Sequence, residues 1–131
     1  MIFPSLLFFD NWGLFILRLA IGLIFIYHAI PKVKNAKGMA GMMGMANMGG
    51  MILLLGSIEL LSGISIIFGY LTQLAALLLA IVMVGSILMK IMRWHVPFAA
   101  MDKTGWEFDL ILLAAALAIL FTGGGSFVIQ P

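Results

Sequence analysis

The sequence contains no cysteine and very few charged residues. Without cysteine, the chain forms no disulfide, holds no thiolate-bound metal and carries out no thiol redox chemistry of its own. Charged residues make up 9% of the 131 residues, against roughly 25% in a typical soluble domain. The net charge of +2 is too small and too dispersed to predict binding to nucleic acid. These shortages exclude an ordinary soluble globular domain.

The N-terminal segment lacks the basic residues that open a secretory signal peptide. Residues 1–12 instead include Pro4, Asp10, Asn11 and Trp12, which suit a lead-in at the level of the lipid headgroups. We therefore expect no cleaved signal peptide. The first apolar segment is expected to remain in the protein as a helix.

Hydrophobic residues dominate the chain, at 64% of the sequence and a mean hydropathy of +1.23. A helix needs roughly 20 apolar residues to cross a hydrocarbon core of about 30 Å. The sequence predicts an all-α integral membrane protein, a four-transmembrane-helix bundle in one domain over residues 1–131. The expected helices lie at about 12–30, 51–71, 74–92 and 106–122, with Pro31 ending or kinking the first of them.

Basic residues fall on alternate loops of this arrangement. The first loop holds Lys32, Lys34 and Lys37, and the third loop or its edge holds Lys90, Arg93 and Lys103. The termini and the second loop hold neither Lys nor Arg. The positive-inside rule then predicts a multi-pass protein of the cell membrane, with loops one and three in the cytoplasm and both termini outside.

Glu59 is the only ionisable residue within the expected helix at 51–71 apart from Tyr70, and it lies near the middle. A charge at that depth costs at least about 2.5–3.5 kcal/mol, so it needs a partner, a proton or a cavity. Gly56, Ser62 and Gly63 share its helical face and allow close approach of a neighbouring backbone. The pattern fits a polar site between helices or a structural ion pair that fixes helix order.

Arg18 is the first candidate partner for Glu59. Their expected depths differ by roughly 9 Å at 1.5 Å per residue, a distance that two long side chains nearly bridge. We therefore expect a buried Arg18–Glu59 pair. The alternative is that Arg18 extends to the outer headgroups.

A second group of polar residues lies at the inner helix ends: Tyr27, His28, Lys32, Lys90, His95, Glu107 and Asp109. Glu107 aligns with a stripe of small residues that should face the bundle, so we expect it to pair with Lys90 or Lys32. Lys90 and Asp109 also fit an interfacial position. His28 is either a metal ligand or proton relay, or simply a hydrogen-bonded helical histidine.

Methionines recur at every third position of the first loop. Three thioethers can hold Cu(I), which makes Met39, Met42, Met45 and Met48 a candidate copper site. The alternative is an adaptable apolar segment that lies at the membrane surface or caps a pocket.

Three blocks of the sequence resemble the DoxX family of small membrane proteins. They are LRLAIGLIFIYHAIPKV (17–33), GSIELLSGISIIFGYLTQLAALLLAIVM (56–83) and GWEFDLILLAAALAILFTGGGSF (105–127). Their order and spacing fit the family, whereas the Met-rich first loop departs from the longer, less Met-rich connection usual there. The resemblance implies a four-helix membrane bundle, and the family takes its name from a subunit of a thiosulfate:quinone oxidoreductase.

The resemblance also implies a set of functional residues. Arg18, Lys32, Glu59 and Glu107 match the family's recurring polar positions. Glu59 and Arg18 are the expected catalytic residues. The expected quinone-binding residues are His28, Tyr27, Lys32, Glu107 and Lys90.

Three functions fit these observations. The first is a quinone-linked redox subunit, with the bilayer, a quinone and other subunits of a redox complex as partners. The second is a non-enzymatic scaffold or accessory subunit of such a complex, or a homo-oligomer. The third is a small-molecule or metal-ion carrier. The word oxidoreductase rests here on family resemblance alone.

Overall fold

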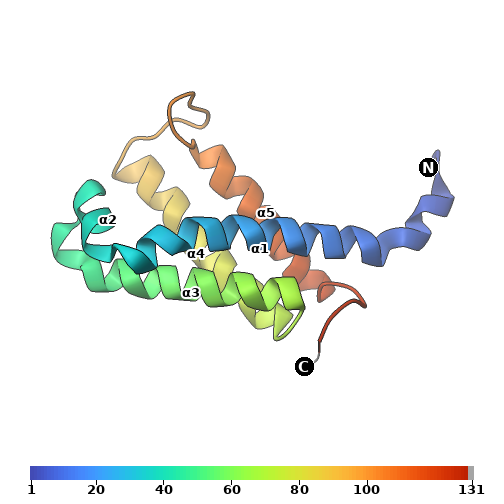
Figure 1. The fold of residues 1–131 in the computed structure, drawn as a ribbon. Coiled ribbons are helices and arrows are strands. Elements are labelled where there is room, and N and C mark those ends of the chain that lie inside the picture. The colour runs from blue at the N-terminus through green and yellow to red at the C-terminus, as the bar shows by residue number, and fades with distance from the viewer. Residues whose placement is uncertain (130–131) are drawn as a thin grey trace.

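The computed structural model describes residues 1–129, and every regular element in this part of the chain is helical. Two short 3-10 helices, η1 and η2, accompany five α-helices (Figure 1). In chain order the elements are η1 (Pro4–Phe9), α1 (Asp10–Lys34), α2 (Ala36–Met42), η2 (Ala46–Met48), α3 (Gly49–Phe68), α4 (Thr72–Met92) and α5 (Trp106–Thr122).

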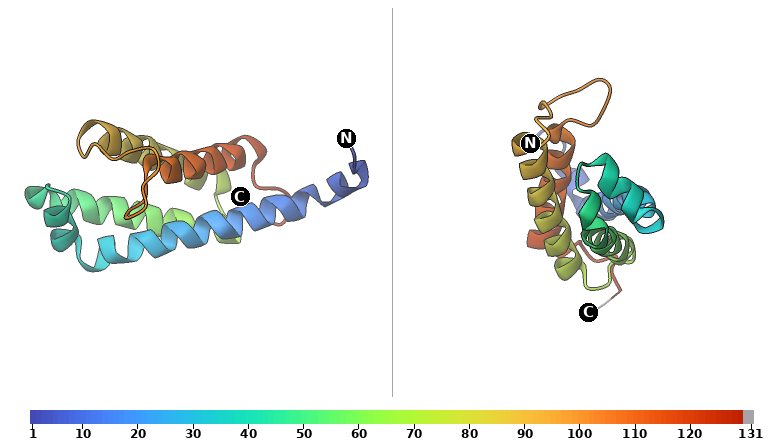
Figure 2. Two further views of the ribbon diagram at one scale, coloured as in Figure 1. Left: turned by 90° about the horizontal axis from the view of Figure 1, so that it is seen from above. Right: turned by 90° about the vertical axis from the view of Figure 1, so that its left-hand side faces the viewer.

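The four long helices form two packed pairs. α1 lies beside α3 in one layer, and α4 lies beside α5 in the other (Figure 2). The tight turn between α3 and α4 links the layers, and α4 diverges from α3 with distance from this turn (Figures 1 and 2). The segments at 35–48 and 93–105 lie toward the end away from the turn, which we call the cap end.

Small residues bring α1 and α3 into close contact. A Cβ atom on Gly22 would lie 2.8 Å from the carbonyl oxygen of Gly63, so a larger residue does not fit without a shift. Farther along, a Cβ on Gly56 would lie 2.7 Å from the Cβ of Lys32. Helices in lipid associate through such close packing because lipid is as apolar as the side chains. The contact also fixes the register that brings Lys32 beside α3.

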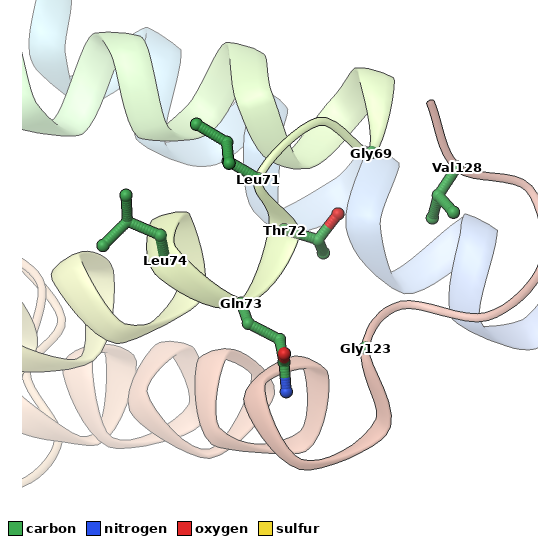
Figure 3. Close-up of a pocket in the computed structure, with 7 residues that line it drawn as sticks. All are labelled: Gly69, Leu71, Thr72, Gln73, Leu74, Gly123 and Val128. Atoms are coloured by element: carbon green, nitrogen blue, oxygen red, sulfur yellow. The ribbon is translucent and has the colours of Figure 1, made fainter. Parts of the chain in front are cut away.

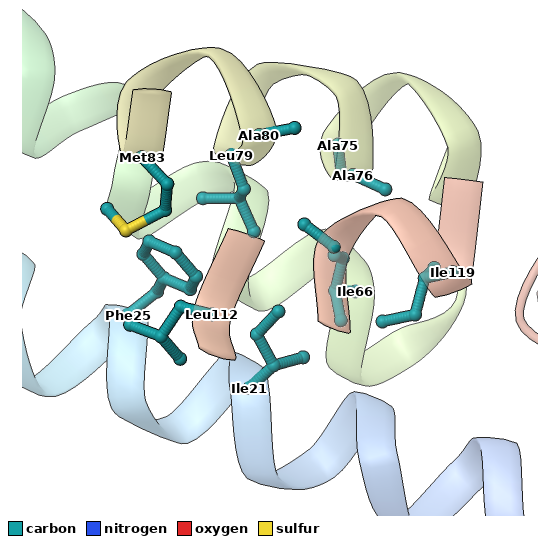
Figure 4. Close-up of a cluster of buried hydrophobic side chains, with 11 residues drawn as sticks. Ile21, Phe25, Ile66, Ala75, Ala76, Leu79, Ala80, Met83, Leu112 and Ile119 are labelled. Atoms are coloured by element: carbon teal, nitrogen blue, oxygen red, sulfur yellow. The ribbon is translucent and has the colours of Figure 1, made fainter. Parts of the chain in front are cut away.

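The apolar core lies between the two layers (Figure 4). α1 and α3 contribute few large side chains, whereas α4 and α5 contribute alanines and leucines that allow the layers to approach. The buried residues of this core are Ile21, Phe25, Ile66, Ala75, Ala76, Leu79, Ala80, Met83, Leu112, Ala116 and Ile119.

Three of the four predicted membrane spans correspond to candidate membrane-spanning helices. The segments Pro4–Lys34, Ala46–Phe68 and Thr72–Met92 are long and apolar enough to cross a bilayer. The fourth predicted segment forms the 17-residue helix α5, about 26 Å long at 1.5 Å per residue. The second predicted span, α3, ends earlier than expected, at Phe68, because Gly69 adopts a left-handed conformation there.

Pro31 does not end the first helix. α1 continues through it to Lys34, and the backbone N–H of Asn35 donates to the Pro31 carbonyl at 2.8 Å. Proline lacks the N–H that would bond to the carbonyl four residues earlier, here that of Tyr27. The helix accommodates this loss, and Lys32 consequently stays on a helical face instead of lying in a loop.

The Met-rich segment, which we define as residues 36–48, is folded. It forms α2 and η2, and Ala40, Met45 and Ile52 make a second apolar cluster. Met89, in the last turn of α4, and Trp94, in the segment after α4, pack against this cluster. The segment therefore fills the space at the cap end where α3 and α4 have diverged.

Candidate functional site

Two buried ion pairs lie at the cap end, one within each helix pair. Lys32 of α1 contacts Glu59 of α3, and Lys90 of α4 contacts Asp109 of α5. A buried charge is stable only when another charge or several hydrogen bonds compensate it. Each layer of the bundle therefore carries its own compensated pair.

The Lys32–Glu59 pair is the better formed of the two. The Lys32 ammonium donates to Glu59 Oε1 at 2.8 Å and to Oε2 at 3.0 Å. The Glu59 side chain is 2% exposed, whereas that of Lys32 is 19% exposed. The carboxylate is thus almost fully enclosed, whereas the ammonium has a third N–H that the pair does not use.

The Lys90–Asp109 pair is close but incompletely hydrogen-bonded. Lys90 Nζ lies 2.7 Å from Asp109 Oδ2, yet the angles leave this buried oxygen without a hydrogen-bond donor among residues 1–129. The Lys90 ammonium instead donates to the Thr104 hydroxyl at 3.0 Å and to the Thr104 carbonyl at 3.3 Å. Asp109 Oδ2 thus has its charge balanced by Lys90 and keeps a lone pair that can accept a hydrogen bond from a bound molecule.

Both pairs face one cavity of about 220 Å³. Charged groups come from all four long helices, and apolar and methionine side chains fill the rest of the wall. Its lining consists of Ile24, Phe25, His28, Pro31, Lys32, Met39, Met43, Glu59, Met83, Ser86, Lys90, Trp94, Thr104, Phe108, Asp109 and Leu112. Small-molecule sites in proteins have this character, mostly apolar with a few convergent polar groups.

A second, almost wholly apolar space of about 340 Å³ lies between α3 and α4. We call it the α3–α4 groove. Lys32, Met43, Glu59 and Ser86 line both the groove and the cavity, so the two spaces share a wall at the Lys32–Glu59 pair. The remaining groove residues are Met45, Met51, Ile52, Leu55, Ile58, Leu78, Ile81, Val82, Gly85 and Met89.

The Met-rich segment covers the cap end of both spaces. Met39 and Met43 line the cavity, and Met43 and Met45 line the groove. The Trp94 indole donates to the Met43 carbonyl at 2.9 Å, and Arg93 donates to the Gly44 carbonyl at 2.9 Å. The segment after α4 therefore holds the Met-rich segment in place. The sequence pattern did not indicate this role for Trp94.

The expected Arg18–Glu59 pair is wrong. Arg18 is 1% exposed, and its guanidinium donates to four backbone carbonyls: Ile66 at 2.9 Å, Ile67 at 2.9 Å, Gly124 at 3.3 Å and Phe127 at 2.6 Å. The extension of α1 past Pro31 gives Glu59 a nearer cation, Lys32. Arg18 satisfies the carboxyl end of α3 and ties the C-terminal segment to the bundle.

The expected pairing of Glu107 with Lys90 or Lys32 is also wrong. Glu107 is exposed, and Asp109 takes the position beside Lys90. The inward face of α5 carries Asp109, Leu112, Ala116 and Ile119 instead of the alanine stripe that follows Glu107. The helical spacing of these four residues could have indicated the inward face of α5. The signal is weak, because the many alanines of α5 make its faces nearly equal in hydrophobicity.

The other predicted site residues are divided between the cavity and the surface. His28 is exposed but lines the rim of the cavity, where its ring centroid lies 5.4 Å from that of Phe108. Tyr27 is 74% exposed and points away from the bundle. His95 lies in the segment after α4, with a positive φ of 50°. Of the predicted quinone-binding residues, His28, Lys32 and Lys90 line the cavity.

The four methionines of the candidate copper site have different surroundings. Met42 is 85% exposed, whereas Met45 is 4% exposed and belongs to the second apolar cluster. Met39 packs against that cluster, and Met48 is partly exposed. The copper site stays a prediction, and in this conformation Met42 and Met45 face opposite environments.

A further cavity of about 300 Å³ lies at the other end, around the α3–α4 turn (Figure 3). It is lined by Gly69, Leu71, Thr72, Gln73, Leu74, Gly123 and Val128, and none of these side chains is ionisable. The Gln73 amide donates to the Leu120 carbonyl at 2.9 Å and so ties α4 to α5. This cavity lacks the groups needed for acid–base chemistry.

Comparison with known proteins identifies the family. The sequence model of the DoxX family matches residues 13–91, which include α1, the Met-rich segment, α3 and nearly all of α4. No curated protein and no solved structure gives a significant match. The matched region holds three of the four residues of the two ion pairs, Lys32, Glu59 and Lys90. The match covers more than half of the chain, which therefore belongs to the DoxX family.

Proposed function

We propose that this protein is a membrane subunit that binds a quinone in the cap-end cavity and takes part in its redox cycle. The observation that carries the proposal is the convergence of two compensated ion pairs on one mostly apolar cavity that adjoins an apolar groove. Quinones need this combination because they join an apolar ring to carbonyl oxygens that accept hydrogen bonds. Membership of the DoxX family adds support.

The ion pairs supply complementary chemistry for such a ligand. The Lys32 ammonium uses its third N–H to donate a hydrogen bond to a quinone carbonyl. Glu59 accepts or releases a proton when the ring gains or loses two electrons and two protons. Asp109 Oδ2 accepts a hydrogen bond from a quinol hydroxyl. The chain has no cysteine for thiol redox chemistry, so a partner subunit supplies or accepts the electrons.

In the same proposal, α5 is a fourth membrane-spanning helix. It packs along the whole of α4 and places Asp109 at the level of Lys90. Six basic residues then lie in or beside the segments at 35–48 and 93–105 of the cap end: Lys32, Lys34, Lys37, Lys90, Arg93 and Lys103. The positive-inside rule assigns this end to the cytoplasm and both termini to the other side of the cell membrane.

The test is to purify the protein in mild detergent, extract it with organic solvent and measure quinone by mass spectrometry. We expect stoichiometric quinone in the wild type and its loss in Glu59→Gln, which removes the charge but keeps the shape. Glu107→Gln is the matched control because Glu107 is exposed outside the cavity. Retention of quinone by Glu59→Gln would show that Glu59 has no role in binding.

A second candidate function is that of a non-enzymatic accessory subunit. The observation that favours it is the full compensation of Arg18 and Glu59 within the fold, which is what packing devices require. Wild-type protein that contains no quinone, and binds none when it is added in lipid nanodiscs, would favour this function.

A further inference from the structure

We propose that the ligand reaches the Lys32–Glu59 pair sideways from the bilayer, through the α3–α4 groove, and that its isoprenoid tail stays in that groove when bound. This inference rests on the proposed function. It adds the route of access and the class of quinone, one with a long apolar tail.

The groove has an apolar opening toward the lipid. Ile81 is 60% exposed on the outer surface and also lines the groove. Gly85, one turn farther along α4, is exposed, and a Cβ there would have no neighbour within 4 Å. The divergence of α4 from α3 makes this opening, and the missing side chain of Gly85 widens it.

The inner end of the groove is the ion pair itself. Glu59 and Lys32 line both the groove and the cavity, so a head group that passes between α3 and α4 meets the ammonium directly. On α4 the groove residues extend from Leu78 to Met89, about 16 Å of helix at 1.5 Å per residue. This length accommodates an extended apolar chain behind a ring held at the pair.

The route from water at the cap end is covered. The Met-rich segment lies over both spaces, and hydrogen bonds from Arg93 and Trp94 hold it there. The cavity, whose lining includes His28 and Thr104, is more polar than the groove. The path between α3 and α4 is therefore the more apolar one for a tail.

The groove adds little affinity by itself, because lipid chains are as apolar as its walls. Its role is to leave room for the tail while the head group binds. Filling the groove should accordingly weaken binding of a long-tailed quinone and spare a quinone that has the same ring without the tail.

The test compares these two quinones in lipid nanodiscs for the wild type, Gly85→Leu and Gly13→Leu. Gly13 is the matched control, since it is also an exposed helical glycine with open space at its Cβ position. We expect Gly85→Leu to weaken binding of the long-tailed quinone about tenfold or more and that of the tail-less quinone less than about twofold. Gly13→Leu should change neither affinity.

A second measurement uses wild-type protein and needs no variant. A long-tailed quinone with a photoreactive diazirine at the end of its tail is bound, irradiated and mapped by peptide mass spectrometry. We expect labels on groove residues such as Leu55, Leu78 and Ile81. Labels on Ile24 and Phe108 would place the tail in the cavity instead and overturn the inference.

The outcomes separate this inference from the proposed function. If neither quinone binds the wild type, the proposed function fails. If both bind and Gly85→Leu leaves both affinities unchanged, the function stands and the α3–α4 route is wrong. Phospholipid that stays in the groove while quinone binds would likewise overturn the route.

Discussion

The two ends of the bundle each bury positive charge, but they compensate it differently. At the turn end, Arg18 is surrounded by four backbone carbonyls, and each of its nitrogens donates at least one hydrogen bond. At the cap end, two lysines meet two carboxylates beside cavities, and one carboxylate oxygen has no hydrogen-bond donor within residues 1–129. The turn end is complete without a ligand, whereas the cap end retains unused hydrogen-bonding capacity. Burial of charge alone thus does not mark a binding site.

Arg18→Ala should have the largest effect on stability, because it leaves four carbonyls without their donor and frees the C-terminal segment. We expect a loss on the order of 5 kcal/mol, at more than 1 kcal/mol for each unsatisfied group. Thermal or denaturant unfolding in detergent micelles measures it. Arg18→Lys is the control, because it keeps the charge but replaces the planar guanidinium, with its several N–H donors, by a single ammonium. It should recover only part of the lost stability. A loss below about 1 kcal/mol would contradict the structural role.

Lys32→Met should have the next largest effect, because it leaves the Glu59 carboxylate buried without a partner. We expect a loss of about 3–5 kcal/mol. The double variant Lys32→Met, Glu59→Gln should regain part of it, since the uncompensated charge is then absent. Unfolding of both single variants and of the double variant forms the cycle. Strictly additive losses would show that the two side chains do not interact.

Lys90→Met should cost slightly less, about 3 kcal/mol, because it too leaves a buried carboxylate without its cation, but the Asp109 side chain is 5% exposed and the Glu59 side chain only 2%. The same unfolding measurement checks it. Asp109→Asn is the informative companion, as it keeps the volume and removes the charge. If Lys90→Met destabilises the protein more than Lys32→Met, the ranking of the two pairs is wrong.

Glu107→Gln should have the smallest effect, within about 0.5 kcal/mol, because substitutions on the surface away from special contacts change stability little. Quinone content should also stay at the wild-type level. A large loss of stability or of quinone in this variant would show that Glu107 belongs to the binding site, as its alignment with the alanine stripe predicted.

The sequence predicts the helices well because hydrophobic runs of membrane length are local properties. The predicted helix at 106–122 matches α5, and the other boundaries differ by a few residues. The need of Glu59 for a buried partner was also predictable, since an isolated carboxylate in hydrocarbon is unstable. Membership of the DoxX family was predictable from sequence blocks, and the matched residues 13–91 include the first two of the three.

The identity of each partner was not predictable, because it depends on the register between helices. The choice of Lys32 over Arg18 follows from the contact of Gly56 with Lys32 and from the passage of α1 through Pro31. The partners of Arg18 are backbone carbonyls, which every residue carries and no sequence pattern marks. The inward face of α5 was likewise ambiguous because alanines lie on several of its faces.

Pro31 has a mechanical consequence for the ion pair that follows it. The helix lacks one backbone hydrogen bond there, so the turn that carries Lys32 bends more easily than the turn that carries Arg18. α1 is accordingly clamped at one end and compliant at the other. A slight flexion at Pro31 swings the Lys32 ammonium relative to Glu59 while the rest of α1 stays fixed on α3. In the proposed function, the cation that binds the ligand thus follows directly on the one turn of α1 from which proline removes a backbone hydrogen bond.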